Sequence, residues 1–222
     1  MTVRFAVLQW TITLLMGASP LMALANNQAG EGTRSTAFVD VSVLSMDANS
    51  LVEDQTVLVH GGEIERIGSV KSVRVPAGAI TIDGRHRYLM PGLTDFHVHF
   101  PDSAQDQRDE LKLLVSNGIT TAVNMHGTPD ILAMRNQLRQ GKLFGTTLYS
   151  TGPYVNEPEF TSPEQVRHAV IAQKAAGYDF IKIHGELSID AYTALINTSR
   201  EQHIRVVGHV PAKLGIDAVL GK

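Results

Sequence analysis

The second half of the chain alternates strand-like runs with helical stretches, and this alternation constrains the fold more than any other feature. The strand-like runs are separated by 26, 27, 33 and 25 residues and begin near Thr94, Thr120, Thr147, Phe180 and Arg205. Repeated strand–helix units predict a parallel sheet, either doubly wound or closed as a (β/α)8 barrel. The first strand is not followed by a GxGxxG turn, which disfavours a dinucleotide-binding fold.

Start and stop signals mark the helices between these strands. Thr128 stands before Pro129, which places a capping hydroxyl ahead of a proline in the first helical turn. Ser162 and Gln165 have the spacing of a capping box, and Ser188 is expected to cap a further helix. The glycines expected to end helices are Gly118, Gly141 and Gly177.

Residues 37–90 have a different pattern, with short alternating runs and no helical period. The runs are Phe38–Val43, Gln55–His60, Glu63–Ile67 and Ala79–Asp83. Gly61 and Gly62 separate the second run from the third and are a hairpin signal. We therefore expect a small β-domain in residues 37–90, with a meander through Ile67 and a further strand at Ala79–Asp83, before the α/β part in residues 91–222.

Residues 1–25 have the features of a secretory signal peptide. Arg4 is their only charge, Phe5–Met16 is mostly apolar, and Ala23-Leu24-Ala25 has the form of a cleavage site. The apolar run is shorter than the roughly 20 residues of a membrane span, which favours cleavage over a retained anchor. We expect a secreted or periplasmic protein with no membrane span after cleavage, and a flexible lead-in at residues 26–36.

Composition excludes several classes of function. The 222 residues include 19 Lys and Arg, 22 Asp and Glu and no Cys, for a formal net charge of −3. A mildly acidic chain without basic runs is a poor candidate for nucleic-acid binding, so we expect a small-molecule substrate. Without cysteine there is no disulfide, no thiolate ligand and no cysteine nucleophile. Composition does not specify an oligomeric state.

The strand after Pro91-Gly92 carries the strongest chemical signal. Alternation divides its side chains into a polar face with Asp95, His97 and His99 and an apolar face with Phe96, Val98 and Phe100. The apolar face is expected to pack against helices. An unpaired imidazole inside a barrel is costly unless something binds it, and two at i and i+2 can hold one divalent ion. Two hydrogen-bonded core histidines are the alternative.

Residues 89–99, LMPGLTDFHVH, resemble the signature of the amidohydrolase superfamily of metal-dependent hydrolases. The likeness is greatest to its imidazolonepropionase-like and Xaa-Pro dipeptidase-like branches, and it extends to the hairpin GGEIERIG at residues 61–68. The resemblance implies a (β/α)8 barrel beside a β-sandwich. It also implies hydrolysis of an amide or dipeptide C–N bond by a metal-activated water. Imidazole ligands in a chain without cysteine favour Zn²⁺.

Two later strands carry further candidate metal ligands. Lys182 and His184 alternate with apolar residues and are expected to face inward, where a lysine must be paired or neutral. A neutral amine can add CO2, and the resemblance implies that such a carboxylated Lys182 bridges two metal ions. A lysine that reaches solvent or pairs with an acid is the alternative. His209 matches the family's third metal histidine.

Five further residues are candidates for supporting the metal ligands or for contacting substrate, with an ordinary structural role as the alternative. They are Asp95, Asn124, His126, Tyr154 and His184.

The sequence thus predicts an α/β protein with a partial (β/α)8 TIM barrel, about five of eight βα units, after a β-sandwich segment. A complete barrel typically needs about 250 residues. The resemblance implies that the family's fourth metal histidine and its catalytic aspartate would lie beyond Lys222. We therefore expect an enzyme of which residues 1–222 are an incomplete part. The alternative is a truncated, catalytically inactive amidohydrolase fragment.

Overall fold

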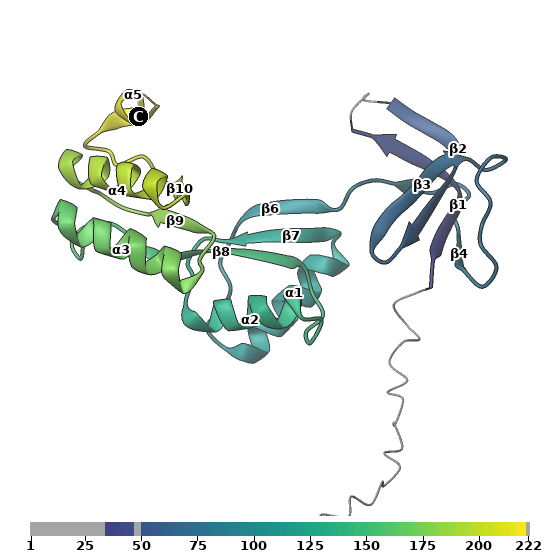
Figure 1. The fold of residues 1–222 in the computed structure, drawn as a ribbon, viewed down its shortest axis with the longest axis horizontal. Helices are drawn as coiled ribbons and strands as arrows, with labels where there is room; N and C mark the ends of the chain where they lie inside the picture. Colours follow the sequence, from purple (N-terminus) through teal and green to yellow (C-terminus); the bar gives the residue numbers. More distant parts are fainter. Residues whose placement is uncertain (1–33, 47–49, 221–222) are drawn as a thin grey trace, which may run out of the picture. The chain divides into compact units, whose positions relative to one another are not determined.

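The computed structural model describes residues 34–46 and 50–220, which form two compact units divided between Met90 and Pro91 (Figure 1). The predicted signal peptide, residues 1–25, lies outside the described residues, as do residues 26–33 of the predicted lead-in.

The first unit is a mixed β-sheet. Its strands are β1 (Thr36–Ser45), β2 (Ser50–His60), β3 (Glu63–Ser69), β4 (Ile80–Asp83) and β5 (Tyr88–Leu89). The first three strands pair antiparallel in chain order. Gly61 and Gly62 connect β2 to β3 with φ angles of 58° and 85°, and two successive positive φ angles are what a tight hairpin turn of this kind needs. The predicted hairpin is therefore confirmed.

The antiparallel meander ends with β3. Both β4 and β5 pair parallel with β1, on the side of β1 opposite to β2. Residues 70–79 therefore carry the chain from β3 to the other edge of β1. A tight turn signal specifies a hairpin locally, but it does not specify which sheet edge a later strand will join.

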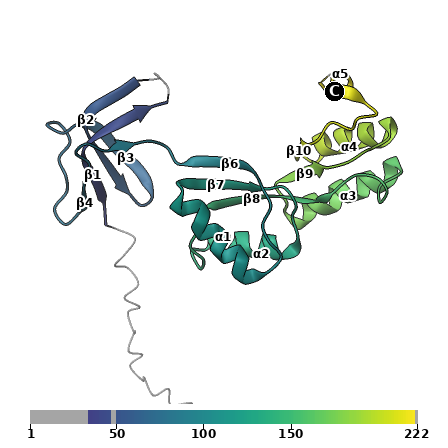
Figure 2. The ribbon, with the colours of Figure 1, turned by 180° about the vertical axis from the view of Figure 1, so that it is seen from behind.

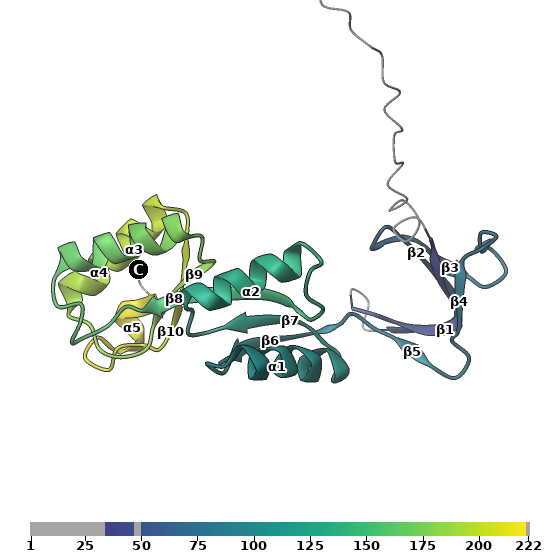
Figure 3. The same cartoon turned by 90° about the horizontal axis from the view of Figure 1, so that it is seen from below.

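The second unit is a curled parallel sheet with helices between successive strands (Figures 1 and 3). Its strands are β6 (Leu93–Val98), β7 (Ile119–Asn124), β8 (Thr147–Tyr154), β9 (Phe180–Ile183) and β10 (Arg205–Gly208). Its helices are α1 (Ala104–Ser116), α2 (Pro129–Arg139), α3 (Pro163–Ala176), α4 (Ile189–Glu201) and α5 (Gly215–Leu220). Strand order in the sheet equals chain order, whereas a doubly wound sheet reverses direction at a switch point. The predicted partial barrel is confirmed.

Helix starts follow the predicted caps. The side chain of Thr128 accepts a hydrogen bond from the backbone of Ile131 at the start of α2, and Ser188 caps α4 in the same way. Ser162 and Gln165 form the complete capping box of α3. Gly177 ends α3 in the left-handed conformation that glycine adopts most readily. These local signals set the spacing between strands, and thereby the positions of the strand ends.

The helices pack on the sheet through two apolar clusters. In the first, Leu111 of α1 and Met134 of α2 contact β6, β7 and β8, with both helices on the same side of these strands (Figure 2). In the second, α3 and α4 cover β9 through Ile181 and Ile183, as predicted. In the residues that the structure describes, no helix is long and apolar enough to cross a membrane.

Phe96 does not join the apolar core, although strand alternation predicted that it would. Phe96 is 65% exposed, whereas Val98 is buried in the cluster and Phe100 packs against it. The pairing of β6 with β7 shifts register between Asp95 and Val98, which interrupts the alternation. The expectation for Phe96 is therefore wrong, and those for Val98 and Phe100 are confirmed.

Candidate metal centre

The imidazoles of His97 and His99 converge at the carboxyl end of β6. Their Nε2 atoms lie 3.2 Å apart, and the two ring planes are inclined by 41°. Zinc–nitrogen bonds are about 2.0–2.1 Å long, so one ion bound to both atoms would have an N–metal–N angle of roughly 100°, close to tetrahedral. A carboxylate oxygen of Asp95 accepts a hydrogen bond from the backbone N–H of His97 at 2.9 Å, which steadies this part of the strand. The pair therefore fits two ligands of one ion.

Asn124 supports this strand end from the neighbouring strand. Its side chain is fully buried, and its carbonyl oxygen accepts a hydrogen bond from the backbone N–H of Phe100, next to His99. Its amide group donates to the carbonyl oxygen of His126 and to the hydroxyl of Ser150. With three partners and no exposed surface, Asn124 joins the ends of β6, β7 and β8. Of the two roles predicted for it, the structure favours support over substrate contact.

Lys182 is buried in β9, with 1% of its surface exposed. Its Cα partners in the sheet are Tyr154 of β8 and Val207 of β10. Among the residues described, no carboxylate forms an ion pair with its amine. Burial lowers the pKa of the Lys182 amine from its usual value, because desolvation penalises the charged form. A buried amine that tends toward neutrality fits the predicted carbamate chemistry.

His209 is fixed to the neighbouring strand by two hydrogen bonds. Its backbone N–H donates to the carbonyl oxygen of Ile183 at 2.9 Å, and its Nδ1 lies 2.8 Å from the carbonyl oxygen of His184. Because a carbonyl oxygen can only accept, Nδ1 carries the proton and Nε2 keeps the lone pair in the neutral ring. A histidine held in this way is typical of a metal ligand.

The described residues do not bring all the predicted ligands to one point. Within residues 34–46 and 50–220, no group of three or more His, Asp or Glu side chains has the geometry to hold a metal ion. His97 lies in β6 and His99 follows it, whereas His209 follows β10, at the opposite end of the strand order. The structure thus shows a converging pair of imidazoles, and it does not join Lys182 and His209 to them in one group.

A row of stacked rings runs across the neighbouring strand ends. The rings of His126 and Tyr154 have centroids 4.3 Å apart with planes inclined by 26°, and those of Tyr154 and His184 are 4.4 Å apart and inclined by 13°. His184 is also 5.0 Å from His209, at 40°. The sequence identified these residues singly, but it did not predict their stack, which we call the ring ladder (His126, Tyr154 and His184).

The surroundings of His99 are basic. Burial lowers the pKa of His99, and the nearby His97, Lys182, His126 and His184 lower it further. All of these side chains therefore lie close enough to His99 to affect its charge. A lowered pKa keeps the imidazole neutral, which is the form that binds a metal.

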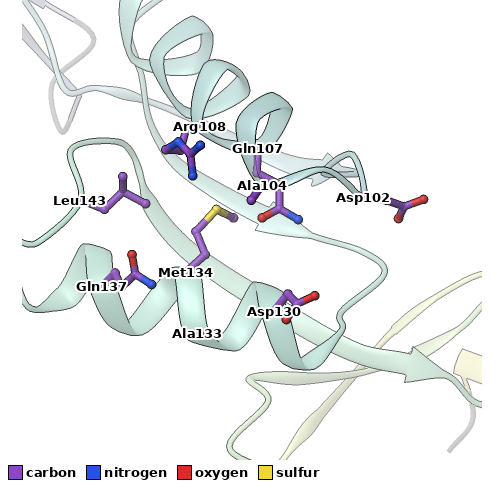
Figure 4. Close-up of a pocket in the computed structure, with 9 residues that line it drawn as sticks. All are labelled: Asp102, Ala104, Gln107, Arg108, Asp130, Ala133, Met134, Gln137 and Leu143. Carbon is purple, nitrogen blue, oxygen red and sulfur yellow. The ribbon is translucent and has the colours of Figure 1, made fainter.

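A separate cavity of about 210 Å³ lies between α1 and α2 (Figure 4). Its charged lining residues are Asp102, Arg108 and Asp130. None of the predicted site residues lines it. It does not bring together the residue types that a catalytic centre needs, and we assign it no role.

Comparison with known proteins identifies the family. The sequence profile of the Amidohydrolase family matches residues 88–219. The chain is 27% identical over 179 residues to an adenine deaminase of Clostridium perfringens (strain 13 / Type A), covering 74% of this chain and 31% of that protein. It is 31% identical over 105 residues to a dihydroorotase of Sulfurihydrogenibium sp. (strain YO3AOP1), covering 44% of this chain and 24% of that one.

Solved structures show the same fold. A Xaa-Pro dipeptidase with bound methionine in the active site superposes with a TM-score of 0.70 at 17% identity, over 79% of this chain and 56% of that one. This likeness supports the fold alone. The chain spans about half the length of such solved structures, and about a third of the length of the curated adenine deaminase.

Proposed function

Because this chain belongs to the amidohydrolase family, we propose that the protein is a metal-dependent hydrolase that cleaves C–N bonds with water. The observation that carries the proposal is the convergence of the His97 and His99 Nε2 atoms at 3.2 Å. The names of the curated relatives support the reaction class, since adenine deaminase and dihydroorotase both describe hydrolysis at C–N bonds. The substrates that we propose are non-peptide amides or dipeptides.

We assign His97, His99, Lys182 and His209 as ligands of one or two divalent ions, of which Zn²⁺ suits the donor atoms best. A bound ion would supply Lewis acidity, which polarises the bond under attack and lowers the pKa of water. A carboxylated Lys182 would offer two oxygens, enough to bridge two ions. We assign no residue of this chain to the removal of the proton from the attacking water.

The other residues of the site hold these ligands in place. Asp95 fixes the backbone at His97, and Asn124 fixes the backbone beyond His99. The carbonyl oxygen of His184 holds the ring of His209 in the orientation that leaves Nε2 free. Such supporting hydrogen bonds commonly change metal affinity or activity by about 10–100-fold when they are removed.

The test is metal removal and replacement in the full-length protein. A panel of N-acyl amino acids, dipeptides and cyclic amides is assayed before chelation, after chelation and after addition of Zn²⁺. We expect turnover of at least one class to disappear on chelation and to return with the metal. Turnover that persists in metal-free protein would contradict the proposal, and so would a metal-loaded protein that is inert toward the whole panel.

We further propose that the protein is exported and that its mature form begins near Asn26. The support is the sequence of residues 1–25, with its single charge, apolar run and small-residue cleavage pattern. Mass spectrometry of the N-terminus after expression in the native host tests this. A retained Met1 in the cytoplasmic fraction would contradict export.

A further inference from the structure

We propose that Ser150 of β8 is a positioning residue of the candidate metal centre, although it lies two strands away from the converging histidines. Its hydroxyl holds the side-chain amide of Asn124, and Asn124 in turn holds the backbone that follows His99. Ser150 thereby sets the affinity of the site for its metal ion. This inference rests on the proposed metal-dependent function, and it adds a residue that the sequence did not identify.

The side chain of Asn124 replaces backbone pairing at the point where β6 ends. The last residue of β6 is Val98, which pairs with Asn124 in the sheet. Two positions later, the backbone N–H of Phe100 donates to Oδ1 of Asn124 at 3.2 Å. Phe100 directly follows His99, so this bond limits the movement of the backbone that carries the His99 imidazole.

The orientation of the Asn124 amide depends on Ser150. Its Nδ2 atom donates to the carbonyl oxygen of His126 at 2.8 Å and to Oγ of Ser150 at 3.1 Å. The Ser150 hydroxyl donates its own hydrogen to the carbonyl oxygen of Thr151 at 2.8 Å, so Oγ acts as the acceptor toward Asn124. Because both N–H bonds of the amide are engaged, its oxygen is directed at the N–H of Phe100.

Burial makes the contact between Ser150 and Asn124 hard to replace. Both residues are 0% exposed. The loop after β7 lies directly on Ser150, since a Cβ added at Gly127 would be 2.6 Å from its Oγ and 1.8 Å from the carbonyl oxygen of Thr151. Removal of the hydroxyl would leave a buried N–H of Asn124 without its acceptor, and an unpaired buried donor is costly. We expect the amide to shift toward another partner and to weaken its bond to Phe100.

Asp179 fixes the backbone of Ser150. The backbone N–H of Asp179 donates to the carbonyl oxygen of Ser150 at 2.9 Å, and the Asp179 carboxylate accepts from the N–H of Ser150 at 2.9 Å. The same carboxylate pairs with the buried guanidinium of Arg135 on α2. A serine whose two backbone groups are both bound presents its hydroxyl in one place, as a positioning residue must.

The experiment measures the zinc affinity of Ser150→Ala in the full-length protein, by competition with a chelator of known affinity. We expect the dissociation constant for zinc to rise by about tenfold, the lower end of the effect of residues that support metal ligands. An unchanged zinc affinity would overturn the inference.

Ser199→Ala is the matched control. Ser199 of α4 is also buried, at 2% exposure, and its hydroxyl has no hydrogen-bond partner among the residues that the structure describes. The control should keep the parental zinc affinity. An equal loss of affinity in both variants would show that removal of any buried hydroxyl weakens the site, and would overturn the specific role of Ser150.

A double variant tests whether Ser150 acts through Asn124. If it does, Asn124→Ala/Ser150→Ala should bind zinc about as weakly as Asn124→Ala alone. The effects of two independent residues would instead multiply. Multiplied effects would contradict the route through Asn124.

Hydrogen exchange in the zinc-free protein separates this inference from the proposed function. The amide of Phe100 should exchange about fivefold faster in Ser150→Ala than in the parent, as the loss of one hydrogen bond allows. Exchange within α4 should stay the same, which a general loss of stability would not permit, and Ser199→Ala should leave Phe100 unchanged. If the parent binds no zinc, the proposed function fails, and exchange at Phe100 still decides whether Ser150 positions that backbone. Unchanged exchange at Phe100 would overturn the inference even in a protein that binds zinc.

Discussion

The Nδ1 atom of His209 donates a hydrogen bond to the carbonyl oxygen of His184, at 2.8 Å across the β9–β10 pair. This contact fixes both the orientation and the tautomer of the His209 ring. It requires a close approach of the two backbones, which Gly208 permits. A Cβ added at Gly208 would lie 2.0 Å from the carbonyl oxygen of Ile183, and the φ of Gly208 is 132°.

The first prediction concerns the close approach of the β9 and β10 backbones at Gly208. Gly208→Ala should lower the free energy of unfolding by about 3 kcal/mol, because it adds a clash to a backbone conformation that only glycine adopts readily. Gly141→Ala is the control, since Gly141 has a φ of 66° but open space around it. In the control, the free energy of unfolding should fall by only about 1–2 kcal/mol, the usual cost of the left-handed conformation for a residue other than glycine. Urea unfolding of the full-length variants measures both, and equal losses would show that close approach at Gly208 is unimportant.

Features set by neighbouring residues were predictable from the sequence. Thr128, Ser162 and Ser188 cap helices as expected, because a cap depends on residues only three positions apart. His97 and His99 converge because they are two positions apart at the end of one strand. The parallel sheet followed from the repeated βα unit, and the barrel order of its strands from the resemblance of residues 89–99 to the amidohydrolase signature.

Features set by pairing between strands were not predictable in the same way. Phe96 is exposed and Tyr154 turns to the ring ladder, and in each case a register shift lies beside the residue. The parallel pairing of β4 with β1 likewise depends on which sheet edge is open when the chain returns. The alternation of residues within one strand does not determine how that strand aligns with its neighbour. Alternation alone therefore predicts the wrong face for a side chain that lies beside a register shift.

The second prediction concerns a buried ion pair that supports the sheet. Arg135 of α2 is almost fully buried and pairs with Asp179, whose carboxylate also accepts from the backbone of Ser150. Asp179→Asn should lower the free energy of unfolding by about 3 kcal/mol, because it leaves a buried guanidinium without its counter-charge.

The exposed pair of Asp109 and Lys112 on α1 is the control for this prediction. Asp109→Asn should cost less than about 1 kcal/mol, since exposed ion pairs contribute little. Both variants are measured by urea unfolding. A similar small loss for Asp179→Asn would mean that the Arg135 pair does not stabilise the fold.

The third prediction concerns Lys182. If its carbamate bridges two ions, Lys182→Ala should lose most hydrolase activity and much of the second metal, and added short carboxylic acids should partly restore both. The expected rescue follows from the ability of a free carboxylate to occupy the bridging position. Lys112→Ala, at an exposed lysine, should keep activity and metal and should not respond to the acids. A Lys182→Ala protein with normal activity would show that Lys182 is not a metal ligand.

The most direct test of the account is the zinc content of the full-length protein with and without the converging pair. His97→Ala/His99→Ala and the control His168→Ala, at an exposed histidine of α3, are purified in parallel with excess zinc and then desalted. Zinc per chain is measured by mass spectrometry of the metal. The account predicts that the double variant loses about one ion per chain or more relative to the parent, and that His168→Ala keeps the parental content. Equal zinc in the double variant and the parent would contradict the assignment of His97 and His99 as metal ligands.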